Sequence, residues 1–342
     1  MSILLLKEII GQDKAIDFLR RVAANDKIAS AYLFAGIQGI GKTTTAMAFA
    51  LLLNCTELDN EDGCGKCTSC RRIIDGNHPD IILVGLDEEK KAIGINQIRE
   101  INRQLAFAPV LGRYRMIIID PAEKMTMEAA NAFLKSLEEP PPGTVFILTA
   151  RDPKELLPTI VSRCQRVPFK PLPTGEIANW LVTERSLDRE AARILAGLSE
   201  GSLGTALRMA EKGLLAERVS WIEMLDRAIN GAPDVLLESA QKFFDLGKKG
   251  KEPKDATAAL MLGIWKSWFR DMLLMKLEGA KELIVNTDLI ERLSTVASGY
   301  SVDRLMKSLA VIASAEYDLI ENRNQLFLIE RSLFGLRGAA DR

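Results

Sequence analysis

A glycine-rich stretch between a short apolar segment and a helix-forming run constrains this chain most. The apolar segment Tyr32–Ala35 leads into Gly36, which begins the eight-residue pattern G-x-x-x-x-G-K-[ST]. This pattern, placed after a strand and before a helix, is typical of a phosphate-binding loop. Glycines let backbone N–H groups face phosphate oxygens, and a helix N-terminus favours negative charge. The alternative is a strand–helix turn without a ligand. We predict a nucleotide site here, formed by Gly36, Gly39, Gly41, Lys42, Thr43 and Thr44.

The second half of such a site is a carboxylate at the end of another strand. Lys42 is expected to reach the outer phosphates of ATP or ADP, and the Thr43 hydroxyl to hold Mg²⁺. The β-branched run that ends in Asp120 supplies the carboxylate. The next residue is Pro121, which can neither accept a proton nor orient a water, and Glu123 lies two residues further on. The magnesium half of the site is therefore predicted to be intact and the hydrolytic half to be damaged.

Apolar runs alternate with helical patterns through the first half of the chain. Helical spacing over residues 7–26 precedes the first strand, and further strands are expected at 80–84, 114–120, 144–149 and 166–169. Helices are expected after the phosphate loop, at 94–107 and at 125–139, where three prolines end the last of them. Strands that alternate with helices predict an α/β fold with a parallel five-stranded sheet covered on both faces.

The second half of the chain has helical patterns only. Residues 170–173 resemble a linker, and helices are expected at 176–186, 188–199, 203–212, 257–277 and 302–319. Because 342 residues are long for one core, we predict three domains: an α/β domain over 1–170, a small helical lid over 171–214 and an all-α domain over 215–342. The apolar stripe around Trp265 and Trp268 is interpreted as core packing, with a partner-binding face as the alternative.

Four of the five cysteines lie close together, at Cys55, Cys64, Cys67 and Cys70. Four clustered thiolates in a reducing compartment predict a closed, structural Zn²⁺ site within an insert over residues 55–72. An iron–sulfur cluster is the competing interpretation, and two arginines follow Cys70 where a ferredoxin-type run has another cysteine and a proline. The single histidine, His78, is a further candidate ligand, although a turn histidine is the simpler interpretation.

Charge and hydropathy restrict the function classes. The net charge of −1 gives no bulk signal for nucleic-acid binding. No apolar run approaches the length of a membrane span, and the N-terminus lacks the features of a signal peptide. We therefore expect a cytoplasmic protein.

Further motifs match one known family. Ile9–Gln12 precedes the phosphate loop, Asn131–Pro141 follows the second strand motif, and Ser162-Arg163-Cys164 precedes the last strand. Together with the cysteine spacing, these motifs resemble those of the AAA+ subunits of bacterial DNA sliding-clamp loaders. The resemblance covers roughly residues 7–212. In the C-terminal third it rests on helical character and on a closing segment around Asn322–Leu336.

The resemblance implies roles for individual residues. Ile10 and Gly11 would lie at the nucleotide base, and Thr149 would occupy the sensor position at the end of the fourth strand. Arg163 would reach into the ATP site of a neighbouring subunit. The all-α domain would join the collar of a five-subunit ring, which loads a sliding clamp onto primed DNA.

Two departures separate this chain from the ATP-hydrolysing motor subunits of that family. Their strand motif continues Asp-Glu, where this chain has Asp120-Pro121, and their lid helix carries an arginine where this chain has Gly204. Both losses concern groups that act on the γ-phosphate, whereas Arg163 is kept. The pattern predicts a subunit that helps a neighbour hydrolyse ATP without hydrolysing it itself.

Three alternatives stay open at this point. The chain could be a motor ATPase of the same family, with Glu123 or another carboxylate in the lost role. An unrelated phosphate-loop kinase or ATPase would leave the S-R-C motif and the cysteine spacing without a reason. A sequence-specific DNA-binding module built on the zinc insert would conflict with the neutral charge and with the absence of paired histidine ligands.

Overall fold

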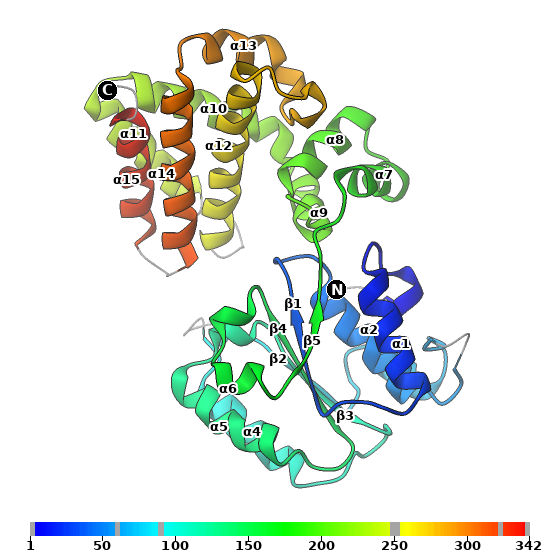
Figure 1. Ribbon diagram of the computed structural model, residues 1–342. Coiled ribbons are helices and arrows are strands. Elements are labelled where there is room, and N and C mark those ends of the chain that lie inside the picture. Colours follow the sequence, from blue (N-terminus) through cyan, green and yellow to red (C-terminus); the bar gives the residue numbers. More distant parts are fainter. Residues whose placement is uncertain (1–3, 59–61, 88–91, 247–253, 321–323, 339–342) are drawn as a thin grey trace. The chain divides into compact units, whose positions relative to one another are not determined.

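The computed structural model describes residues 4–58, 62–87, 92–246, 254–320 and 324–338 (Figure 1). It divides into two compact units. The first contains Met1–Glu176 and Gly201–Thr205, and the second contains Ile177–Glu200 and Ala206–Arg342. The division into three domains stays a prediction.

The first unit is built on a five-stranded, fully parallel sheet. Its strands are β1 (Ala31–Ala35), β2 (Ile81–Val84), β3 (Arg115–Ile119), β4 (Thr144–Ala150) and β5 (Gln165–Pro168), in the order β2-β3-β4-β1-β5. The predicted fold class is confirmed. The three central strands are buried on both faces, which explains why their sequences are continuous apolar runs rather than alternating ones.

Helices cover both faces of this sheet (Figure 1). On one face, Tyr32 of β1 packs its ring edge-on against Phe49 of α2 (Lys42–Asn54) and Phe18 of α1 (Asp13–Ala24). On the other face, the alternate strand residues share one apolar core with α4 (Ile95–Leu105), α5 (Met127–Glu138) and α6 (Pro158–Val161). Shorter elements complete the unit: η1 (Leu6–Glu8), α3 (Thr68–Ile74), η2 (Ala122–Lys124) and η3 (Pro153–Glu155).

The helical spacing over residues 7–26 does not form one continuous helix. The chain makes the single turn η1, passes through Gly11 and begins α1 at Asp13. Gly11 has a φ of +70°, a left-handed conformation that is not helical and that favours glycine. An apolar period alone does not reveal this break, because Ile10 and Ala15 both face inward on either side of it.

A buried ion pair holds the loop between α4 and β3. The Asp80 carboxylate is completely buried, and it accepts hydrogen bonds from the backbone N–H groups of Val110, Leu111 and Gly112. The Arg115 guanidinium lies 3.1 Å from the same carboxylate and also donates to the carbonyls of Gln104 in the last turn of α4 and of Phe107 and Ala108 in the loop. Burial works against ionisation of Asp80, but these donors outweigh it and hold the pKa of the carboxyl below its usual value. The loop is therefore anchored by a buried polar network, in which the Arg115 Nε has no hydrogen-bond partner among the described residues.

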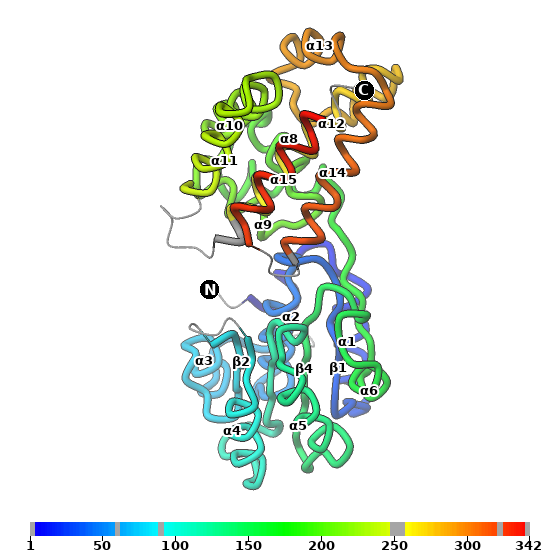
Figure 2. Tube along the Cα trace, turned by 90° about the vertical axis from the view of Figure 1, so that its left-hand side faces the viewer, coloured from blue at the N-terminus to red at the C-terminus, as the bar shows by residue number. Residues whose placement is uncertain are grey.

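The second unit is helical throughout its described residues. Its elements are α7 (Thr174–Arg185), α8 (Arg189–Leu198), α9 (Leu203–Glu211), α10 (Leu214–Asn230), α11 (Pro233–Leu246), α12 (Lys254–Lys276), η4 (Lys281–Leu283), η5 (Thr287–Leu289), α13 (Ile290–Ser298), α14 (Val302–Ile320) and α15 (Gln325–Gly338). Helices α7 and α9 begin in the first unit. Helices α12, α14 and α15 lie side by side in both views (Figures 1 and 2). No helix among the described residues combines the length and hydrophobicity of a membrane span.

The tryptophan stripe of α12 forms the core of this second unit. Trp265 and Trp268 have no exposed surface, and Phe269 is only 1% exposed. The Trp265 ring meets Phe243 of α11 edge-on, with 5.0 Å between the ring centroids. The stripe is therefore core packing rather than a surface for a partner.

Candidate functional site

The glycine-rich loop connects β1 to α2 at the carboxyl edge of the sheet, where parallel sheets place their ligands. Gly41 caps α2 with a φ of +101°, a backbone conformation that L side chains rarely adopt. The Lys42 side chain is 9% exposed, and its Nζ donates to the carbonyls of Gly36 at 2.6 Å and Ile37 at 2.9 Å. Burial lowers the pKa of Lys42, while Glu123 and Asp120 oppose that shift. The ammonium is thus held at the loop, where a phosphate would replace the carbonyls.

The two predicted magnesium ligands meet in this structure. The Thr43 hydroxyl donates to one carboxylate oxygen of Asp120 at 2.5 Å, and the Thr149 hydroxyl donates to the other. Thr43 lies on α2, Asp120 directly follows β3, and Thr149 lies on β4. The fold thus brings together residues that are far apart in the sequence. The arrangement fits a hydrated Mg²⁺, since both a P-loop hydroxyl and a strand carboxylate face one point. Their roles toward a nucleotide stay predictions.

Glu123 also faces this cluster. It lies on η2, one turn after β3, and its Oε2 is buried without a hydrogen-bond partner among the described residues. Burial raises the pKa of Glu123; the Arg151 backbone N–H and the Lys42 ammonium lower it, and the Glu155 carboxylate adds to the rise. The sequence leaves the surroundings of this side chain open, and in the structure its carboxylate is buried and interacts electrostatically with the Lys42 ammonium.

The segment Gly201–Thr205 lies directly on the glycine-rich loop. Ser202 donates its hydroxyl to the Gln38 carbonyl at 2.8 Å, and the backbone N–H of Gly204 donates to the Gly39 carbonyl at 2.9 Å. A Cβ at Gly204 would lie 2.7 Å from the Gly39 oxygen and 3.0 Å from its Cα. The structure therefore requires glycine at position 204, because only a residue without a side chain permits this backbone contact.

We accordingly expect that Gly204→Arg, which restores the residue of the motor subunits, does not create a working site. The side chain would push the segment off the glycine-rich loop, and even Gly204→Ala should lower the stability of the chain by about 1–3 kcal/mol through overpacking. Chemical denaturation of the two variants measures this. Gly175→Ala is the matched control, because Gly175 is likewise the second residue of its helix and a Cβ there meets nothing within 4 Å. Equal stability of Gly204→Ala and Gly175→Ala would contradict the account.

The predicted base-binding motif is joined to the end of the sheet. The Gln12 side chain donates to the Lys170 carbonyl at 2.9 Å and accepts from the Lys170 N–H at 3.2 Å. A Cβ at Gly11 would lie 2.7 Å from the side chain of Leu172, so glycine is required for this close approach. Ile10 is half-buried beside it. The motif is thus part of the packing of the unit, and contact of Ile10 and Gly11 with a base stays a prediction.

Arg163 lies at the other edge of the sheet from the glycine-rich loop. It comes two residues before β5, and β5 runs parallel to β1, whose carboxyl end carries the loop. The four residues of β5 alone separate the two edges by about 10 Å. The Arg163 guanidinium is exposed and bonds to Glu138 and to the Thr159 carbonyl. Arg163 therefore lies away from its own loop, and its role in the ATP site of a neighbouring subunit stays a prediction.

The four clustered cysteines come together beside α2 and α3. Their Sγ atoms all lie within 4.8 Å of one another, in Cys55, Cys64, Cys67 and Cys70. A tetrahedral zinc site requires sulfur separations of about 3.8 Å, from a Zn–S distance of about 2.3 Å. Backbone N–H groups donate to three of these sulfurs at 3.2–3.4 Å and so fix their positions. The cluster can therefore bind a metal ion.

His78 is not part of the cysteine cluster. Its Nε2 lies 3.1 Å from the Ser69 hydroxyl, and its Nδ1 accepts from the backbone N–H of Asp80. Burial lowers the pKa of the imidazole, with Arg72 adding to that shift and Asp80 opposing it. A neutral ring that joins α3 to β2 agrees with the interpretation as a turn histidine.

Three contacts could not be found from the sequence, namely those of Ser202 with Gln38, of Glu138 with Arg163 and of Asp80 with Arg115. Each contact joins residues that are at least 25 positions apart in the sequence. The one available signal was indirect, since Glu138 lies in the Asn131–Pro141 segment that resembles a family motif.

A glycine-rich loop on a parallel sheet, a strand carboxylate facing it and a segment packed on the loop together form an α/β module of the phosphate-loop kind. A family model described as "DNA polymerase III, delta subunit" matches residues 11–173. The delta' subunit of DNA polymerase III from Bacillus subtilis is 29% identical over 332 residues, which cover 95% of this chain and 96% of that protein. The chain is therefore similar to delta' subunits of DNA polymerase III, over nearly the whole length of one of them.

Two other relatives match less of their own length. The delta' subunit of Pseudomonas aeruginosa is 38% identical over 199 residues, or 57% of this chain and 60% of that protein. The tau subunit of Bacillus subtilis is 29% identical over 311 residues, or 84% of this chain. The chain spans about half the length of that tau subunit, namely 54%.

Proposed function

We propose that this chain is the delta-prime subunit of a bacterial DNA polymerase III clamp loader. It would assemble with gamma/tau and delta subunits into a hetero-pentamer and help to load the sliding clamp onto primed DNA during replication. The match to the Bacillus subtilis delta' subunit over nearly its whole length supports this choice over a tau-type subunit.

In this proposal the chain does not hydrolyse ATP itself but supplies Arg163 to the ATP site of a neighbouring subunit. The observation that carries the proposal is the position of Arg163, exposed and at the edge of the sheet remote from its own glycine-rich loop. A guanidinium delivered from a neighbouring subunit stabilises the charge that develops on the transferred phosphoryl group.

The chain's own loop would bind ATP or ADP as a structural ligand. Lys42 would contact the outer phosphates, and Thr43 with Asp120 would hold Mg²⁺. Pro121 replaces the residue that follows the strand carboxylate in motor subunits, and Gly204, whose backbone contacts the glycine-rich loop, stands where their lid helix carries an arginine. The loop would therefore hold nucleotide without turning it over.

The metal at the cysteine cluster would be a structural Zn²⁺. Four thiolates leave no open coordination position, so the ion would stabilise the insert and take no part in phosphoryl transfer. Asp62, which follows the cluster's first cysteine in the chain, accepts from the N–H groups of Leu6 and Lys7 and so joins the insert to the N-terminal segment.

The second candidate function is that of a gamma/tau-type motor subunit. The direction of Glu123 favours it, because a carboxylate beside Lys42 could orient a water in place of the residue lost at Pro121. ATP turnover by the purified chain separates the two functions. The delta-prime proposal expects none above background, and a motor subunit would show turnover that depends on Lys42.

A further inference from the structure

We propose that Glu138 is the positioning residue for Arg163, holding the guanidinium in the orientation in which it enters the neighbouring ATP site. This inference rests on the proposed role of Arg163 and adds to it a residue that has no contact with the nucleotide. Its carboxylate comes from α5, whereas Arg163 follows α6.

Two hydrogen bonds fix the direction of the guanidinium plane. Nη2 of Arg163 lies 2.7 Å from Oε1 of Glu138, and Nη1 donates to the Thr159 carbonyl at 2.9 Å. A guanidinium has five N–H donors in a rigid fork, so these two bonds leave three for another acceptor. Arg163 can therefore stay bonded to Glu138 while it donates to a phosphate of the neighbouring subunit.

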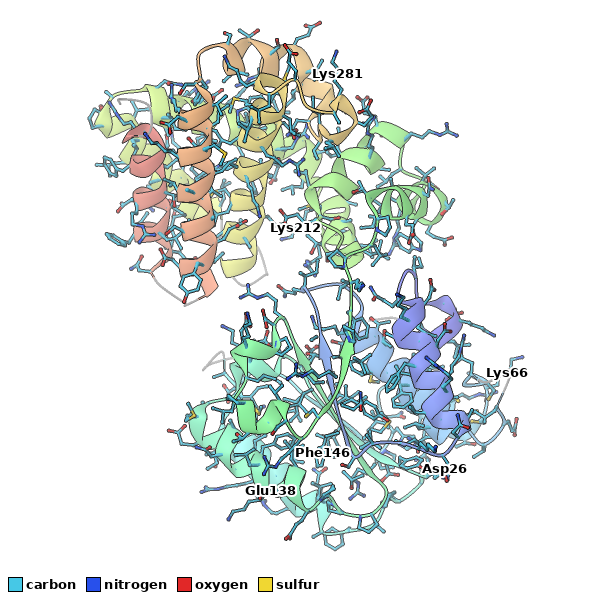
Figure 3. The ribbon with its side chains drawn as sticks, viewed as in Figure 1. Asp26, Lys66, Glu138, Phe146, Lys212 and Lys281 are labelled. Carbon is cyan, nitrogen blue, oxygen red and sulfur yellow. The ribbon has the colours of Figure 1, made fainter. Side chains whose placement is uncertain are left out.

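The backbone segments that carry Glu138 and Arg163 pack into the same apolar core. Leu137, next to Glu138, and Cys164, next to Arg163, are buried in the core cluster that also contains Ile160 and Val161 of α6. Figure 3 labels Glu138 at the end of α5, on the surface of this layer. Because the two backbones are held by packed side chains, the carboxylate is a fixed reference point for the guanidinium.

The position of Glu138 argues for a specific partner. It is the last residue of α5, and the negative end of the helix dipole disfavours a carboxylate there. The side chains of Glu138 and Arg163 are 51% and 36% exposed, so their pair contributes little to folding stability. The effect that remains is geometric, because a pre-oriented arginine loses less rotational freedom when it reaches the phosphate.

A double-mutant cycle in the reconstituted clamp loader tests this inference. DNA-stimulated ATP turnover is measured for complexes that carry Glu138→Ala, Arg163→Ala or both, with the ATP dependence recorded for each. We expect Glu138→Ala to lower kcat at the neighbouring site about three- to tenfold without raising KM for ATP. It should have no further effect in the Arg163→Ala background, because Glu138 acts through that arginine.

Glu139→Ala is the matched control, since Glu139 is the adjacent, exposed carboxylate, and it should leave turnover unchanged. Higher turnover in Glu138→Ala would overturn the proposal, because it would mean that Glu138 withholds Arg163 from the site. An equal loss in both backgrounds, or no loss in either, would overturn it too. If Arg163→Ala itself left turnover unchanged, the proposed role of Arg163 in the neighbouring ATP site would be wrong. That outcome is distinct from a failure of the role proposed for Glu138 alone.

Discussion

Arg163→Ala should remove nearly all DNA-stimulated ATP turnover at the one neighbouring site that this chain is proposed to serve. Arginine fingers supplied from a second molecule accelerate phosphoryl transfer about 10³–10⁵-fold in other nucleotide hydrolases. The exposed guanidinium lies about 10 Å or more from its own glycine-rich loop, so its loss should not disturb that loop. Total ATP turnover by the ring should fall by the fraction that this one site contributes. Clamp loading onto primed DNA should fall with it.

Two further variants sharpen this result. Arg163→Lys keeps the charge without the planar fork and should recover only a small part of the activity. Arg166→Ala is the control, because Arg166 is an exposed arginine three residues further on, in β5. Turnover and loading that stay at the wild-type level in Arg163→Ala would mean that the Arg163–Glu138 pair is an ordinary surface ion pair.

Loss of one cysteine ligand should unfold the insert around the cluster. Structural zinc contributes about 10–16 kcal/mol of apparent binding free energy in zinc-finger peptides, and α3, with seven residues, is too short to persist alone. We expect one Zn²⁺ per chain by elemental analysis and none in Cys70→Ser. The free energy of unfolding should fall on the order of 3–5 kcal/mol with the lost site.

The fifth cysteine supplies the control for this experiment. Cys164 is buried in the core away from the cluster, and burial raises the pKa of its thiol to about 12. Cys164→Ala should therefore keep the full zinc content. Retention of zinc by Cys70→Ser would exclude the four-thiolate site, and iron with visible absorbance in the wild-type chain would establish an iron–sulfur cluster instead.

Much of the fold could be predicted because its signals are local. The glycine pattern before Lys42, the buried run that ends in Asp120 and the cysteine spacing each lie within a few consecutive residues. Strand boundaries agree with the structure within about one residue, since a strand buried on both faces is apolar along its whole length. The meeting of Thr43 with Asp120 follows from the parallel order of their elements.

What could not be predicted depends on contacts between distant segments. The approach of Gly204 to Gly39 requires a backbone path that no pattern in the sequence encodes. The direction of Glu123 depends on how the chain turns after Pro121 rather than on its distance from Asp120 along the sequence. Glu138 was part of a recognised segment, but its bond to Arg163 depends on the packing of α5 against α6.

The most direct test of the central claim is steady-state ATP turnover by the purified chain alone, at saturating Mg²⁺ and with primed DNA present. Lys42→Ala defines the background, because it removes the ammonium that is expected to contact the phosphates. We expect that the wild-type chain does not exceed this background, since Pro121 and Gly204 replace the two motor-subunit residues that act on the γ-phosphate. Brisk turnover that is lost in Lys42→Ala would contradict it and identify a motor subunit with Glu123 as its base.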